Sequence, residues 1–157
     1  RSRLQLWDFW RGKLTAVEGA SVTLDVPDKS CYVLSVRAEL PRPQLIGTSG
    51  HFSQGLLEVS DVQWDDRGRQ LLGRVRGNGG EATTLFFHVP AGIQCTTVSV
   101  DYKQLPVTLA EPNVLAVAVP AIAGAAAPFE LRFTGQAAKC QSRAFVAGPV
   151  GKLSSDK

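Results

Sequence analysis

The sequence predicts an all-β protein, folded as an antiparallel β-sandwich of the immunoglobulin-like or jelly-roll-like kind. Short runs in which apolar and polar residues alternate recur along the chain, as half-buried strands require. About ten such runs follow one another at intervals of roughly 8–12 residues, separated by proline, glycine or polar turn residues. No amphipathic stretch of helical period is long enough for a core helix. An alternative within the same class is two small sheets in tandem.

The first forty residues predict a small antiparallel meander. The runs LQLWDFW and KLTAV are followed by ASVTLDV, in which Val22, Leu24 and Val26 alternate with polar residues. The turn-forming PDKS interrupts this pattern, and CYVLSV resumes it. We therefore expect residues 1–40 to form a meander of short strands.

A proline-rich joint, ELPRPQ, marks the main internal boundary. Each proline fixes its own φ, lacks a backbone donor and favours an extended preceding residue. Residues 41–150 are predicted to form the β-sandwich domain. In its first half, GLLEVSDVQWD and RQLLGRVRG are joined by the hairpin signal DRG, and NGG at 78–80 makes the next turn before the strand ATTLFFHVP.

The second half of the chain continues in the same way, with the strand-like runs CTTVSVDY, VLAVAVP and FELRFTG. Alanine favours a turn of helix in AIAGAAAP, which Gly124 and Pro128 limit to a few residues. The final residues, 151–157, lack apolar periodicity and are predicted to be a disordered tail.

Composition limits the classes of function. The chain has 157 residues, 44% of them hydrophobic, and carries a formal net charge of +3. It has no apolar run near the ~18 residues of a membrane span, so none is predicted. Its basic residues are scattered, and alternation places the nearest approach to a patch mostly on one solvated face, so no nucleic-acid partner is expected. That group comprises Arg67, Arg69, Arg74 and Arg76.

The start of the chain and its cysteines give weaker indications. The chain begins at Arg1 and contains no methionine, which indicates a segment of a longer protein, and its compartment is not predicted. With three widely spaced cysteines, no CxxC and only two histidines, neither a structural zinc nor any other cofactor is expected. The cysteines fit either one disulfide with one free thiol or three buried thiols.

Candidate catalytic groups are few. His51 lies in a polar segment beside Ser49 and Ser53, but the strand-to-helix elbow of a GxSxG nucleophile is absent. Asp65 and Asp66 are adjacent in a predicted turn, which disfavours the separation that glycoside hydrolysis requires. RGNGGE precedes a β-branched and aromatic run rather than a helix, so a hairpin turn is favoured over a phosphate site.

The aromatic residues are the remaining candidates for a binding surface. In WDFW, strand alternation places Trp7 and Phe9 on one face and Trp10 on the other. One face belongs to the core. The other serves either as a platform for sugar rings or, the favoured interpretation, as a contact with a neighbouring domain. Trp64 is a further candidate of the same kind.

Three motifs carry a resemblance to a known family. LWDFWRGKL, then SVTLDVPDKSCYVLSVRA, then PQLIGTSGHFSQGLLEVSDVQWDDRGRQLLGRVRG resemble the C-terminal β-sandwich region of α-galactosidase-like (melibiase-like) glycoside hydrolases. The resemblance covers roughly residues 4–76, and PQLIGTSGHFSQG and DVQWDD are its most specific parts. Two positions depart from the family pattern: Gly47 stands where serine is preferred, and Gly50 where arginine is preferred.

The resemblance implies where the chemistry of such a hydrolase lies. The family's catalytic carboxylates belong to a (β/α)₈ barrel that precedes this region and needs about 200 residues or more. No catalytic residue is therefore carried over to this chain, which is not predicted to be an enzyme by itself. The resemblance also implies that TSGHFSQG is a connector between sheets, with His51 structural or at a contact between domains.

Three hypotheses of function follow. The first is a non-catalytic accessory domain that stabilises or positions the barrel, which is then its partner. The second is an autonomous carbohydrate-binding module that uses exposed aromatic residues. The third and least favoured is a small hydrolase in which His51 acts with Ser49 or Ser53 and is oriented by Asp61 or Asp65. The candidates for a carbohydrate or domain-interface site are Trp7, Trp10, His51 and Trp64.

Overall fold

Twelve antiparallel strands in three sheets make up the computed structural model, which describes residues 3–19, 21–77 and 80–137. Within these ranges there is no helix, so the predicted all-β class is confirmed. No helix there is long and apolar enough to cross a membrane. The predicted tail at 151–157, the end of the predicted sandwich domain after residue 137, and Cys140 lie outside the described residues.

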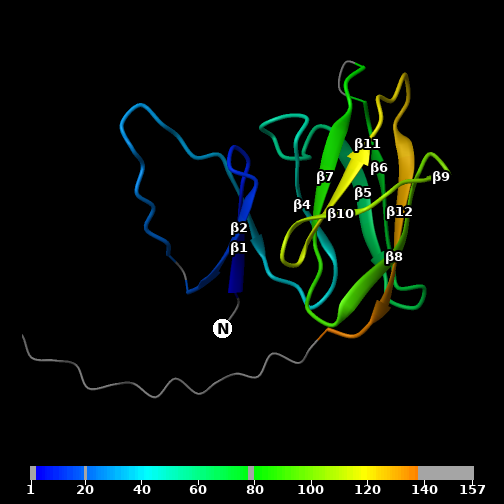
Figure 1. Ribbon diagram of the computed structural model, residues 1–157, viewed down its shortest axis with the longest axis horizontal. Coiled ribbons are helices and arrows are strands. Elements are labelled where there is room, and N and C mark those ends of the chain that lie inside the picture. The colour runs from blue at the N-terminus through cyan, green and yellow to red at the C-terminus, as the bar shows by residue number, and fades with distance from the viewer. Residues whose placement is uncertain (1–2, 20, 78–79, 138–157) are drawn as a thin grey trace, which may run out of the picture.

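The N-terminal sheet contains three strands in the order β2-β1-β3. These strands are β1 (Arg3–Asp8), β2 (Lys13–Glu18) and β3 (Leu34–Ala38). A tight turn joins β1 to β2, because the Asp8 carboxylate accepts the backbone N–H groups of Trp10 and Arg11 at 3.0 and 3.1 Å. In Figure 1 this sheet lies on the left, beside the sandwich formed by the other two sheets.

The other nine strands form a sandwich of two sheets. The four-stranded sheet has the order β10-β11-β7-β4 and contains β4 (Gln44–Thr48), β7 (Thr83–His88), β10 (Thr108–Glu111) and β11 (Val114–Val119). The five-stranded sheet has the order β5-β6-β12-β8-β9 and contains β5 (Val59–Asp65), β6 (Gln70–Val75), β8 (Ile93–Val100), β9 (Lys103–Gln104) and β12 (Ala127–Gly135).

Alternating residues of the two sheets make the main core. In β12, Phe129, Leu131 and Phe133 are buried, whereas the residues between them are half-buried or exposed. From the opposite sheet Phe87 meets Phe129 edge to face, with 5.9 Å between ring centroids. Complete burial of each such side chain contributes about 1.5–3 kcal/mol. This core holds the sandwich together.

The N-terminal sheet covers the outer face of the four-stranded sheet and makes the molecule three layers deep. Trp7 of β1 is 1% exposed and packs on Phe86 of β7, with 4.6 Å between ring centroids. Ile46 and Val114 complete this second, smaller core. The middle sheet is therefore buried on both faces around β7, where Phe86 and Phe87 face opposite layers.

Two segments differ from the predicted strands. Residues 21–26 form no strand, and Val22, Leu24 and Val26 are 45%, 39% and 52% exposed. An alternating pattern becomes a strand only beside a pairing partner, and β1 pairs instead with β2 and β3. By contrast, the residues just before the predicted connector TSGHFSQG form β4, which includes only the first connector residue, Thr48, and is buried from Leu45 to Thr48.

Two connections also differ from their predictions. The NGG turn does not close a hairpin, because β6 and β7, on either side of it, belong to different sheets; Asn78 and Gly79 themselves are outside the described residues. The AIAGAAAP segment forms an irregular link into β12 rather than a turn of helix. The DRG turn does join β5 to β6 as a hairpin, as predicted.

Candidate functional site

The four candidate residues occupy four separate places in the fold. Trp7 lies between two layers, and Trp10 is 60% exposed in the turn between β1 and β2. His51 is half-buried in the segment after β4, and Trp64 is half-buried on the edge strand β5. The structure does not bring these four residues together on one surface, so they do not form a single site.

Trp7 lies at a contact within the chain. A Cβ at position 47 would stand 2.5 Å from Cδ1 and 2.7 Å from Nε1 of its indole. Since no real Cβ approaches another heavy atom so closely, only glycine fits beside the ring. The first departure from the family pattern, Gly47, is thus explained by the packing of the N-terminal sheet on β4.

Trp10 belongs to a turn that is well fixed by its neighbours. Its ring meets Phe9 edge to face at 4.8 Å, and the Arg11 guanidinium donates to Asp8 Oδ2 at 2.8 Å while lying 4.0 Å from the Tyr32 ring centroid. Burial alone would raise the pKa of Asp8, but the hydrogen bonds from Arg11 and Trp10 outweigh burial and leave that pKa below its ordinary value. Trp10 is not among the lining residues of four hollows of the described structure.

Residues 49–58, here named the connector, use their polar side chains for the chain's own irregular backbone. The Nδ1 of His51 accepts the backbone N–H of Ser53 at 3.1 Å, and Ser49 Oγ accepts that of Thr84 at 2.8 Å. Gln54 has a φ of 53° and donates through Nε2 to the Val33 carbonyl at 3.2 Å, which joins the connector to the approach to β3.

A buried carboxylate, Glu58, closes the connector. One of its oxygens accepts a hydrogen bond from the Ser53 hydroxyl at 3.2 Å. Gly50 lies beside it, where a Cβ would stand 2.6 Å from the Thr83 hydroxyl and 3.5 Å from Glu58 Oε1. Gly50, the second position that departs from the family pattern, therefore also has no room for a side chain.

The hydrolase hypothesis requires a serine hydroxyl within hydrogen-bond reach of a base. Among the described residues, the Ser53 hydroxyl donates to Glu58 and the Ser49 hydroxyl accepts from Thr84, while His51 binds a backbone N–H. The carboxylates named for orientation are also directed elsewhere, since Asp61 accepts from Ser60 and Asp65 accepts from the Arg67 backbone. None of these contacts joins the hydroxyl of Ser49 or Ser53 to the imidazole of His51, as the hydrolase hypothesis requires.

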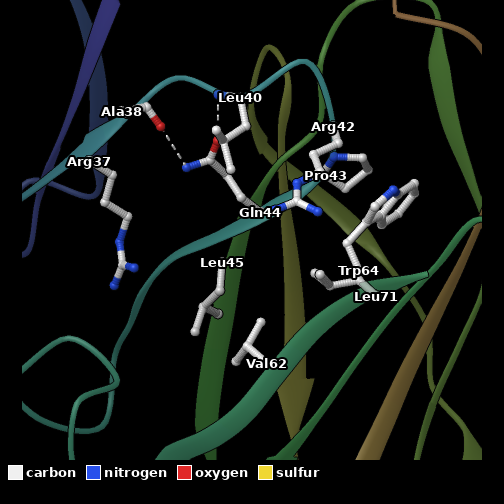
Figure 2. A pocket seen from close by; sticks show the side chains of 10 residues that line it. All are labelled: Arg37, Ala38, Leu40, Arg42, Pro43, Gln44, Leu45, Val62, Trp64 and Leu71. Atoms are coloured by element: carbon white, nitrogen blue, oxygen red, sulfur yellow. Dashed lines mark hydrogen bonds between the residues drawn. The ribbon is translucent and has the colours of Figure 1, made fainter. Parts of the chain in front are cut away.

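Trp64 lines a groove of about 480 Å³ at the open edge of the sandwich, here named the edge groove (Figure 2). Its indole N–H donates to Asp66 Oδ1 at 2.5 Å, and its ring lies 5.8 Å from that of Phe133. Leu45 and Val62 provide apolar lining. Figure 2 shows Arg37, on β3, across the groove from Trp64.

Two arginines of the edge groove were not anticipated from the sequence. Arg37 is half-buried, and burial lowers the pKa of its guanidinium because the charged form loses water. Arg42, in the proline-rich joint, is exposed. The only sequence signal was the joint itself, since PRPQ places a charged residue between two rigid positions.

A second groove, of about 440 Å³, runs between β3 and the connector and is here named the connector groove. Its apolar lining includes Val36, Phe52 and Leu56, which are 58%, 61% and 82% exposed. Leu57, in the same turn, is 67% exposed. Exposed apolar side chains of this size in one place are typical of an interaction surface.

The described cysteines and acidic residues provide no metal centre. No group of three or more His, Cys, Asp or Glu among them is arranged to hold a metal ion. Cys31 is exposed, which corrects the option of three buried thiols, and Cys95 is half-buried; both are free. Burial raises the pKa of Cys95 to about 11, and the backbone contact with Thr97 offsets only part of that effect.

Comparison with known proteins gives no assignment for these surfaces. No protein-family model matches the chain. No curated protein sequence matches it significantly either. The family resemblance therefore rests on the motifs of residues 4–76 alone.

Proposed function

We propose that this chain is a non-catalytic β-sandwich domain of a glycoside hydrolase, which stabilises or positions a catalytic (β/α)₈ barrel. Two supports carry the proposal: the resemblance of residues 4–76 to such regions, and the exposed apolar surface of the connector. The connector begins with residues 49–55, the second half of the motif PQLIGTSGHFSQG, so the two supports overlap in that segment. The barrel would bind by burial of apolar surface, without bond-making by this chain.

The connector groove is the surface assigned to the barrel. The polar side chains of the connector are engaged within the chain, as described for Ser49, Ser53 and Gln54, and so are not free for an outside ligand. Its apolar side chains point outward, with Leu56 82% exposed. Burying one such leucine at an interface contributes about 1.5–3 kcal/mol.

The test compares Leu56→Asp with Leu109→Asp in the full-length hydrolase. Leu109 is 72% exposed on β10, away from the connector groove, so it provides a matched control. In this chain alone both variants should melt like the wild type. In the full-length protein Leu56→Asp should lower the melting temperature of the barrel or reduce its glycosidase activity, whereas Leu109→Asp should not. Equal behaviour of the two variants would contradict the proposal.

A second candidate, carbohydrate binding by this chain, is favoured by one observation. Trp64 lines a groove whose volume of about 480 Å³ falls in the range of small-molecule sites, roughly 300–1,000 Å³. Its polar N–H is engaged by Asp66, and the rest of the ring is apolar. An aromatic ring beside apolar side chains and a few polar groups is the usual lining of such sites.

A further inference from the structure

The edge groove lies where the sandwich is open. β4 is the edge strand of the four-stranded sheet and β5 is the edge strand of the five-stranded sheet. Leu45 of β4 and Val62 and Trp64 of β5 line the groove between these two edges. Residues 37–44 pass along it and contribute its two cationic side chains, Arg37 and Arg42. The groove thus combines an apolar floor with positive charge.

The two guanidinium groups lack a carboxylate partner within the described chain. Arg3, Arg11 and Arg132 each form an ion pair with an acidic residue, but Arg37 and Arg42 do not. Arg37 Nε donates only to the Ser35 hydroxyl, at 3.0 Å.

Because Arg37 is partly buried, its lack of a carboxylate partner matters more than it would at an exposed position. Other arginines without an acidic partner, such as Arg67 and Arg76, are exposed, so water solvates their charge, and the half-buried Arg69 donates to the Gly135 carbonyl. Arg37 is half-buried and has lost part of that solvation. A partly desolvated cation that faces a groove is stabilised by an anion bound there, and a guanidinium suits a carboxylate or sulfate through paired N–H donors.

The proline-rich joint holds this charge in place. Gln44 Oε1 accepts the Leu40 backbone N–H at 2.9 Å, and its Nε2 donates to the Ala38 carbonyl at 3.1 Å, as the dashed lines in Figure 2 show. Pro41 and Pro43 restrict the backbone on either side of Arg42. The joint is therefore tied to the end of β3, which limits the entropy lost when Arg42 engages a ligand.

We propose that the edge groove binds an anionic saccharide, whose separate carboxylate or sulfate groups are held by Arg37 and by Arg42 and whose ring contacts Trp64. The proposal rests on the second candidate function, carbohydrate binding, and adds the charge of the ligand. A neutral sugar would leave the half-buried Arg37 without a counter-ion. A simple inorganic anion would leave the apolar floor of Leu45, Val62 and Trp64 without a contact.

Isothermal titration of this chain tests the proposal with three oligosaccharides of equal length: a uronate oligomer, a sulfated galactose oligomer and a neutral galactose oligomer. A polyglutamate peptide of similar charge is the fourth probe. The variants are Arg37→Gln, Arg42→Gln and Trp64→Ala, with Arg76→Gln as the matched control, because it removes the same charge from an exposed position outside the groove. Melting curves show that each variant is folded.

At least one anionic oligosaccharide is expected to bind at least tenfold more tightly than the neutral one. Arg37→Gln, Arg42→Gln and Trp64→Ala should each raise its Kd at least tenfold, and Arg76→Gln should change it less than twofold. Equal binding of the neutral oligosaccharide would keep carbohydrate binding but overturn the role of charge. Binding of polyglutamate as tight as that of the sugars, or equal losses in Arg76→Gln, would overturn the saccharide site. No binding of any saccharide to the folded chain would overturn both.

Discussion

Gly47, on β4, and Gly50, in the connector, each lie in close contact with a side chain from a distant part of the sequence. Gly47 lies against Trp7 and Gly50 against Thr83. Neither has a backbone conformation in the left-handed region, so the requirement for glycine is one of space, not of φ. At both positions, a side chain from another strand occupies the space that a Cβ would need.

The fit between Gly47 and Trp7 predicts the effect of one added methyl group. Gly47→Ala should lower the free energy of unfolding by about 1–3 kcal/mol, because the indole has to move from its position between the layers. Trp7→Phe leaves the region of Cδ1 and Nε1 emptier, so the double variant should lose less than the sum of the two single variants. Urea denaturation measures both effects, and strictly additive losses would contradict the close contact.

At the scale of elements, short polar contacts decide where strands end. The β1–β2 turn follows Asp8, whose carboxylate serves two backbone N–H groups. By contrast, residues 21–26 have an alternating pattern but remain outside the sheet β2-β1-β3, because they pair with neither β1 nor the edge strands. An alternating pattern therefore shows that a segment is able to form a strand, and the segment forms one only where it pairs with a neighbouring strand.

The role of Asp8 predicts the cost of removing its carboxylate. Asp8→Ala should destabilise the protein by about 1–3 kcal/mol, because two turn N–H groups lose their acceptor. The ion pair with the partly exposed Arg11 adds little to this figure. Asp28→Ala, at an exposed position in the loop before β3, should change stability by less than about 0.5 kcal/mol. Thermal unfolding of the two variants checks the difference, and similar melting temperatures would refute the role given to Asp8.

On the scale of the whole molecule, the pattern of single strands predicted the class but not the arrangement of the layers. The alternation in FELRFTG is fully visible in the sequence, and β12 follows it. The contact between Trp7, Phe86 and Val114 was not predicted from the sequence, because it depends on which sheet covers which face. The edge groove was missed for the same reason: Arg37, Arg42 and Trp64 come together only where two sheet edges and a joint converge.

Because of His88, the free energy of unfolding is expected to depend on pH. It is 5% exposed at the end of β7, and its Nδ1 has no hydrogen-bond partner among the described residues. Burial lowers its pKa from 6.5; Glu39 opposes this effect and Arg3 adds to it. The unfolded chain thus binds a proton more readily than the folded one. Stability contributed by neutral His88 is complete above pH 6.5 and decreases as the pH falls below that value.

Unfolding free energies measured from pH 7.5 to about pH 5 test this effect. The wild type should lose stability across this interval. His88→Gln should show a flatter profile, because glutamine does not titrate. The same slope in His88→Gln as in the wild type would show that another group is responsible.

The small core around Trp7 also has a consequence for the order of events during synthesis. Trp7 leaves the ribosome before Val114, which completes its surroundings and follows about 100 residues later in the chain. At 5–20 residues per second this interval lasts roughly 5–20 s. During that time the N-terminal hairpin lacks part of the surface on which Trp7 packs. The N-terminal sheet is thus synthesised before the surface on which it packs is complete.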